Sequence, residues 1–301
     1  MQFKSYREKI LRNRFGNWIN GYARNKKDLR LLVGDIGFGL FDDLRSEFPE
    51  VFINCGIAEQ NMIGTAAGIA SEEIETWVYT IIPFLLYRPY DFVRNMICHQ
   101  NLNVKLVGVG GGLVYDTLGF THFALEDLAI AKTLPNLDIF LPYDPDNAEK
   151  IFSIAANQNN PVYIRLMKGG EDNIGCFSAG DGFDIINDIN DSEVSIFAYG
   201  SHVKEALKAT ESLNKIGITT KLVAIWNVKA LQKLESCFSK KNFFYEEHFF
   251  GGIFERFSEK SDCFYNYIKY ETLSNFYNRN KLLAMNNFDA ESIFNSISEE
   301  Q

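Results

Sequence analysis

The chain has 301 residues, of which 46% are hydrophobic and 23% charged, and its net charge is −9. This composition predicts a globular protein with two domains, and the acidic charge argues against nucleic acid or an anionic membrane as a partner. Five scattered cysteines without C-x-x-C spacing, four dispersed histidines and the lack of an apolar signal core or membrane-length run predict a cytoplasmic protein without disulfides or a metal site.

Apolar runs and helical periodicity predict strands that alternate with helices. In chain order we expect helix 1–28, strands 29–33 and 51–53, a helix that begins near 59, strand 75–82, helix 90–99, strand 104–109, helix 126–133, strand 138–141, helix 146–157 and strand 161–168. A linker rich in Gly, Asp and Asn, 169–192, precedes strand 194–198, helix 202–215 and strand 221–226. The pattern predicts an α/β fold of two open, mainly parallel sheets flanked by helices, with domains at 1–180 and 190–301.

One stretch, 54–70, joins a strand end to a helix that is rich in small residues. Its sequence is NCGIAEQNMIGTAAGIA, and Glu59 is the carboxylate at the junction. A Glu in the first turn of a helix often does no more than complement the helix dipole. The residues on both sides of Glu59 suggest a more specific role.

The string GIAEQNMIG, residues 56–64, resembles the signature of the pyrimidine-binding domain of transketolases. The resemblance implies that thiamine diphosphate is the cofactor, that Ile57 lies at its site, and that Glu59 hydrogen-bonds a nitrogen of its aminopyrimidine ring. A carboxyl group in that place exchanges a proton with the ring and favours the tautomer whose exocyclic amine deprotonates the thiazolium carbon. The resemblance therefore makes Glu59 a catalytic and cofactor-binding residue.

Two further segments match positions that line the cofactor in this family. Asp35 lies in a Gly-rich turn, 34–39, and a plain strand–helix turn explains it equally well. Phe84, Tyr87 and Tyr90 have a spacing typical of a helix core, but the family places a ring here that stacks on the aminopyrimidine. The resemblance implies Asp35 and Phe84 as cofactor-binding residues, with Tyr87 as the second choice for the stacked ring.

Positions that face the substrate in the family follow the strand at 104–109. Gly119-Phe120-Thr121-His122 resembles the family motif G-P-T-H, which implies that His122 exchanges a proton with a substrate oxygen; a structural histidine is the alternative. Gly110 and Leu118 fall where transketolases carry a His and an Asp that contact sugar hydroxyls. These two departures put the usual sugar phosphates in doubt.

The strand at 161–168 brings two cations, Arg165 and Lys168, toward the edge where ligands bind in open parallel sheets. The family uses a basic residue near Lys168 for the substrate phosphate, and a solvated pair of cations is an equally good explanation. In the second domain, Glu246, Glu247 and His248 resemble a segment of the transketolase C-terminal domain, and we interpret them as structural polar contacts.

Transketolases resemble the chain over 25–301, but they carry a further domain that binds the diphosphate and Mg²⁺ through a GDG…N motif. Here Gly180-Asp181-Gly182 lies in the linker and is interpreted as a coincidence. The chain is therefore expected to hold half of the cofactor site and no metal ligand. A separate N-terminal transketolase-like subunit would hold the diphosphate and Mg²⁺, and a homodimer of this chain would form the core of a hetero-tetramer.

The resemblance thus implies the C-terminal subunit of a split transketolase-like enzyme that transfers a two-carbon ketol unit between sugar or sugar-phosphate substrates. One alternative is a subunit like 1-deoxyxylulose-phosphate synthase or the β chain of 2-oxoacid dehydrogenases, which would decarboxylate a 2-oxoacid. Another is a non-catalytic interaction module that keeps the fold. Glu59 with its complete flanking string argues against the module.

Overall fold

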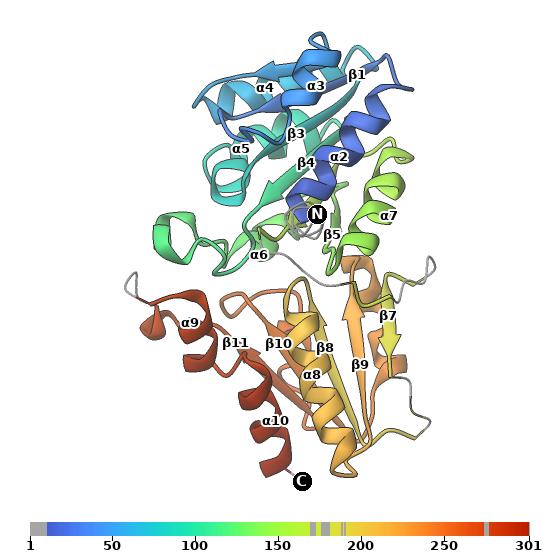
Figure 1. The fold of residues 1–301 in the computed structure, drawn as a ribbon, viewed down its shortest axis with the longest axis vertical. Coiled ribbons are helices and arrows are strands. Elements are labelled where there is room, and N and C mark those ends of the chain that lie inside the picture. Colours follow the sequence, from blue (N-terminus) through green and yellow to red (C-terminus); the bar gives the residue numbers. More distant parts are fainter. Residues whose placement is uncertain are drawn as a thin grey trace, which may run out of the picture. The chain divides into compact units, whose positions relative to one another are not determined.

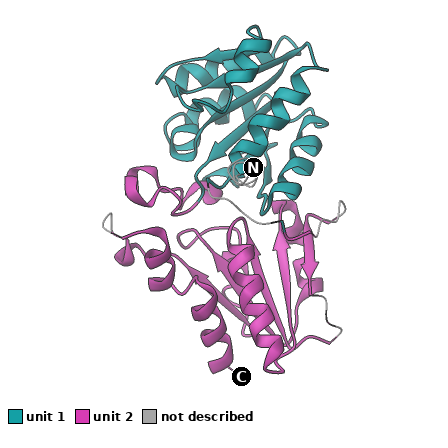
Figure 2. Cartoon of the chain, viewed as in Figure 1, with its two compact units in different colours: residues 1–111, 130–173 teal, residues 112–129, 174–301 magenta. Residues whose placement is uncertain are grey.

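The computed structural model describes residues 11–168, 173–175, 181–187, 189, 191–273 and 277–300. The chain forms two compact units, which Figure 2 shows in different colours: 1–111 with 130–173, and 112–129 with 174–301. The segment 112–129, which the sequence-based division assigns to a domain at 1–180, belongs to the second unit. Within the described ranges, no helix is long and apolar enough to cross a membrane.

The described part of the first unit contains a six-stranded parallel sheet in the order β2-β1-β3-β4-β6-β5. Figure 1 labels β1, β3, β4 and β5 of this sheet. The strands are β1 (Leu29–Val33), β2 (Phe52–Asn54), β3 (Glu75–Ile81), β4 (Val104–Val109), β5 (Asp138–Phe140) and β6 (Val162–Leu166). The longer strands are mostly apolar because a central parallel strand is covered on both faces. The predicted strands are confirmed here to within about two residues.

The helices in the described part of this unit are α2 (Leu11–Ala23), α3 (Asp42–Glu47), α4 (Glu59–Ala70), α5 (Tyr90–Phe92) and α7 (Pro145–Ala156), with two π-helical segments, η1 (Pro83–Tyr87) and η2 (Val93–Cys98). Part of the predicted helix 1–28 lies outside the described residues. The predicted helix 90–99 is instead a short α-turn followed by η2, in which backbone hydrogen bonds such as His99 N to Arg94 O span five residues.

An aromatic cluster fills the core between α2, α7 and the sheet. The ring of Phe15 lies 5.7 Å from both Trp77 and Tyr79 and 5.3 Å from Phe152, centroid to centroid. Successive strand residues point to opposite faces, so Thr80 of β3 points the other way, toward the face on which Met62 of α4 packs beside Gly34. The sheet is thus covered on both faces.

Chain order reverses at β1 in this sheet. β2 lies on one side of β1 and β3 on the other, so the loops after β1 and β3 leave the sheet beside each other at its carboxyl edge. Open α/β sheets bind their ligands in the crevice at such a switch point. The expected site residues Asp35 and Phe84 follow β1 and β3.

The second unit contains a five-stranded sheet in the order β11-β10-β8-β9-β7, parallel except for β7. Its strands are β7 (Phe183–Ile186), β8 (Val194–Tyr199), β9 (Thr220–Ile225), β10 (Lys241–Glu246) and β11 (Cys263–Tyr267). The fold class predicted from the sequence is confirmed. The interpretation of 169–192 as linker throughout is wrong, because β7 lies within it and pairs antiparallel with β9.

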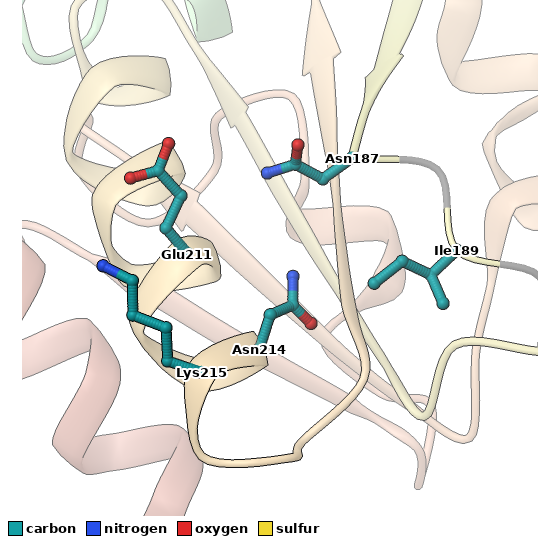
Figure 3. A pocket seen from close by; sticks show the side chains of 5 residues that line it. All are labelled: Asn187, Ile189, Glu211, Asn214 and Lys215. Carbon is teal, nitrogen blue, oxygen red and sulfur yellow. The ribbon is translucent and has the colours of Figure 1, made fainter.

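Helices α8 (His202–Lys215), α9 (Arg279–Met285) and α10 (Ala290–Glu299) belong to this unit, and α10 packs on α8. Short 3-10 segments complete the described part: η3 (Asp116–Leu118), η4 (Phe120–His122), η5 (Val228–Gln232), η6 (Leu234–Cys237), η7 (Glu255–Phe257) and η8 (Tyr270–Thr272). Helix α6 (Asp127–Ala131) spans the point at which the chain returns to the first unit. A pocket on α8 is lined by Asn187, Ile189, Glu211, Asn214 and Lys215 (Figure 3), on a different element from every predicted site residue.

Candidate functional site

The turns after β1 and β2 are tied together by Asn54. Its side-chain oxygen accepts hydrogen bonds from the backbone N–H of Asp35 at 3.1 Å and of Gly56 at 3.0 Å, and its amide donates to Asp35 Oδ1 at 3.0 Å. Asp35 has φ = 54°, a left-handed conformation that is uncommon outside glycine. Asn54 therefore fixes the carboxylate of Asp35 at the switch point, a role that the sequence did not reveal.

Glu59 begins α4 and is 7% exposed. Its carboxylate lies in the first turn, where the helix dipole favours negative charge. Oε1 accepts a hydrogen bond from Nη1 of Arg88 at 2.8 Å. Ile57, two residues earlier, is 78% exposed, so an apolar side chain stands at the surface beside a largely buried carboxylate.

The π-helical turn η1 brings Phe84 to the same place. The backbone N–H of Arg88 donates to the carbonyl of Pro83 at 3.3 Å, a bond that spans five residues. Such π-turns are frequent at functional sites. The guanidinium carbon of Arg88 lies 4.1 Å from the centroid of the Phe84 ring. Glu59, Arg88 and Phe84 therefore form one cluster; Tyr87, on the same turn, is half-buried.

Arg88 was not predicted from the sequence. The signal that could have found it is its spacing from Phe84, because residues four apart on a helical turn lie on the same face. Its side chain is 51% exposed, so it can reorient without unfolding its surroundings.

Gly110 and Arg165 lie at the adjacent strand ends. The backbone N–H groups of Gly110 and Gly111 both donate to the carbonyl of Leu166, at 2.8 and 3.2 Å. A Cβ on Gly111 would stand 2.5 Å from the Arg165 guanidinium, which shows how closely the backbone covers that side chain. Arg165 is 2% exposed, whereas Lys168 is exposed. Of the two cations, Lys168 is therefore the one whose side chain reaches solvent.

Leu118 and His122 lie in the second unit, on η3 and η4. Leu118 is 51% exposed. His122 is half-buried, and its Nδ1 lies 2.9 Å from the hydroxyl of Thr121. Of the predicted site residues, the first unit brings Glu59 and Phe84 together through Arg88. Asp35 follows β1, which pairs with β3.

Glu247 is the centre of a buried charge cluster in the second unit. It is 3% exposed; Oε1 accepts from the Leu113 N–H at 2.7 Å, and Oε2 lies 2.6 Å from Nη2 of Arg279 and 3.3 Å from Nδ1 of His202. Burial alone raises the pKa of Glu247, but Arg279, His202 and the Leu113 N–H outweigh it and lower the pKa to about 2. These contacts tie the segment 112–129 to α8 and α9.

The neighbouring polar residues also make structural contacts. Glu246 accepts hydrogen bonds from the backbone N–H groups of Ile253 and Phe254 and from the hydroxyls of Tyr199 and Tyr265. Nε2 of His248 accepts from the Ala129 N–H at 3.4 Å. In the part of the chain that the structure describes, no group of three or more His, Cys, Asp or Glu side chains could hold a metal ion.

Comparison with known proteins shows what the chain is similar to. Residues 8–170 match the family described as the transketolase pyrimidine-binding domain. A transketolase C-terminal section from Methanocaldococcus jannaschii is 29% identical over 232 residues, which cover 75% of this chain and 72% of the relative. One of the subunits of an apulose-4-phosphate transketolase from Phocaeicola vulgatus is 30% identical over 224 residues, which cover 72% of this chain and 71% of the relative.

Solved structures show the same fold over nearly the whole chain. A split-gene transketolase, described as an inactive β4 tetramer, superposes with a TM-score of 0.80 at 26% identity and is covered over 97% of its length by 96% of this chain. A transketolase from Campylobacter jejuni superposes with a TM-score of 0.84 at 18% identity, and this chain spans 46% of it. The second likeness concerns the fold alone.

Proposed function

This chain belongs to the transketolase family, as its C-terminal section, and we propose that it is the pyrimidine-binding subunit of a split, thiamine-diphosphate-dependent enzyme that transfers a two-carbon ketol unit between sugar substrates. The observation that carries the proposal is the placement of Glu59. A largely buried carboxylate at the start of α4, within the family's signature string, faces a planar cation that lies on Phe84.

The residues around Glu59 fit the ring of the proposed cofactor. The Arg88 guanidinium, a planar group with N–H donors, already lies over the Phe84 ring and donates to Glu59. An aminopyrimidine ring is also planar and presents nitrogen atoms at its edge, so it can use the same aromatic face and the same carboxylate. When bound, thiamine diphosphate supplies the nucleophilic carbon that carries the two-carbon unit.

The positions of Glu59 and Phe84 support the roles that we propose for them. Glu59 holds a proton on Oε1 and exchanges it with the ring nitrogen, while Phe84 orients the ring by stacking. We propose that Asp35, which Asn54 holds in place, makes further contacts to the cofactor together with Ile57 and Tyr87. His122 exchanges a proton with a substrate oxygen.

A separate N-terminal transketolase-like subunit would hold the diphosphate and Mg²⁺. Two observations support a partner: a relative is named as one subunit of its transketolase, and a split-gene transketolase chain matches this one over 97% of its own length. Each half would supply contacts to one end of the cofactor, so tight binding needs both. Two copies of each subunit, paired about a two-fold axis, would give a hetero-tetramer.

The substrate is proposed to be a sugar other than the common pentose and hexose phosphates. Gly110 and Leu118 cannot make the side-chain contacts to sugar hydroxyls that the family makes at these positions. A relative that is 30% identical is named for apulose 4-phosphate. Exposed Lys168 would bind the substrate's anionic group.

The decisive experiment is calorimetry with thiamine diphosphate and Mg²⁺, first on this chain alone and then on its mixture with the partner subunit. We expect tight binding only to the mixture, together with ketol transfer between sugars. Tight, Mg²⁺-dependent binding to the lone chain would refute the split site. Release of carbon dioxide from pyruvate by the mixture would instead indicate the decarboxylating alternative.

A further inference from the structure

Arg88 has no catalytic part in the proposed function, yet it uses both surfaces that the site offers to a planar ligand. Its Nη1 donates to Glu59 Oε1 at 2.8 Å, and its guanidinium carbon lies 4.1 Å from the centroid of Phe84. A guanidinium and the amino-substituted edge of a pyrimidine are both flat N–C–N groups with N–H donors. The two groups therefore compete for the same aromatic face and the same carboxylate oxygen.

We propose that Arg88 acts as a built-in ligand: without cofactor its guanidinium occupies the place of the aminopyrimidine ring between Glu59 and Phe84, and the ring binds only when Arg88 swings away. The inference rests on the proposed function, because it takes the ring to bind at Glu59. It also explains how Glu59, 7% exposed, keeps a charged partner before the ring arrives.

The cluster is built so that Arg88 can be displaced. Its side chain is 51% exposed, and its backbone lies where η1 ends, directly before Pro89. Its contacts are an ion pair with Glu59, of which only the Arg88 side is open to water, and one guanidinium–aromatic contact, and each is weak where the side chain is exposed. Together they would lower the apparent affinity for the ring by about threefold to twentyfold, because only the fraction of molecules with Arg88 turned away can bind.

The test uses 4-amino-5-hydroxymethyl-2-methylpyrimidine, the ring without its diphosphate, titrated into the complete chain by calorimetry. Arg88→Met should bind this probe about threefold to twentyfold more tightly than the natural chain. Arg88→Lys keeps the charge without the flat guanidinium and should fall between the two. The matched control is Arg94→Met, since Arg94 is an exposed arginine in η2 whose Nη1 donates to Asn95; its affinity should not change.

The salt dependence of probe affinity is a second readout, which would not change if Arg88 had only a structural role. Because the Arg88 side chain of the Arg88–Glu59 pair is half-exposed, sodium chloride screens the pair, so the natural chain should bind the neutral probe more tightly as salt is added. Arg88→Met should show no such trend. Thermal unfolding of each variant confirms that it is folded.

The outcomes separate the two proposals. Suppose that the natural chain binds the probe and that Arg88→Met binds it equally or more weakly. The proposal that Arg88 is a built-in ligand is then wrong, and the proposed function is unaffected. Titration of thiamine diphosphate and Mg²⁺ into the complex with the partner subunit tests the proposed function. Failure of every protein to bind the probe or the cofactor, even in the complex, removes the proposed function and the inference with it.

Discussion

Replacing Glu247 with Gln should destabilise the second unit by about 3 kcal/mol at pH 7. The folded-state pKa of this buried carboxylate is about 2, whereas a Glu in an unfolded chain titrates near ~4.3. The difference, at ~1.36 kcal/mol per pKa unit, gives about 3 kcal/mol. The loss of one partner of a buried ion pair, here the partner of Arg279 and His202, is independently expected to cost about 3–5 kcal/mol.

This stabilisation depends on pH in a defined direction. Because the pKa is lower in the folded chain than in the unfolded chain, the stabilisation by Glu247 is fully present above ~4.3 and is lost as the pH falls through about 2. At pH 3 the carboxylate should contribute about 1.4 kcal/mol, less than half of its value at pH 7.

Urea unfolding at pH 7 and pH 3, followed by circular dichroism and tryptophan fluorescence, measures the effect. The gap between the natural chain and Glu247→Gln should shrink from about 3 to about 1.4 kcal/mol. Glu211→Gln, an exposed change on α8 in the same unit, is the control and should differ from the natural chain by less than about 0.5 kcal/mol at both pH values. A gap at pH 7 that is absent, or that stays constant to pH 3, would refute the electrostatic reasoning.

Three further predictions concern the site and its support. Glu59→Gln should leave the fold intact and lower the turnover of the reconstituted enzyme by about a hundredfold or more, since the proton exchange is lost; near-normal turnover would remove Glu59 from the mechanism. Gly112→Ala should cost about 2 kcal/mol or more in urea unfolding, because φ is +66° and the new methyl would meet the Glu247 carboxyl; an unchanged midpoint would contradict this close packing. Xylulose 5-phosphate with ribose 5-phosphate should be a poor substrate pair in a coupled assay, and efficient turnover of it would show that Gly110 and Leu118 do not restrict the substrate.

Much of the fold is predictable from the sequence because a parallel sheet covered on both faces leaves nearly continuous apolar runs. The runs 29–33 and 104–109 correspond to β1 and β4. β7 was missed because its short segment, Phe183–Ile186, lies among Gly, Asp and Asn, and because its register comes from pairing with β9. The two terminal helices, α9 and α10, were also not predicted.

The candidate site also contains residues that were predicted from the sequence and residues that were missed. Glu59 was predicted because its local string resembles the family signature, and Phe84 was predicted by counting from Glu59 to the position of the family's stacked ring. Arg88 was missed because its four-residue spacing from Phe84 was not used, and the contact of Asn54 with Asp35 was missed because it joins residues 19 positions apart. Glu247 has partners 134 residues before it and 32 after it, so its depressed pKa is a property of the folded chain alone.

The assignment of 112–129 to the second unit has a practical consequence for dividing this protein. The chain passes between the units at three places, after residues 111, 129 and 173, so cutting once within the linker does not separate two self-sufficient modules. A fragment that stops near 180 would carry buried Phe123 and Leu125 without the rest of the second unit, including the Phe249 N–H that donates to the Leu125 carbonyl. The first unit could therefore be exchanged between related enzymes only if the segment 112–129 stayed with the second unit or were repacked on the new one.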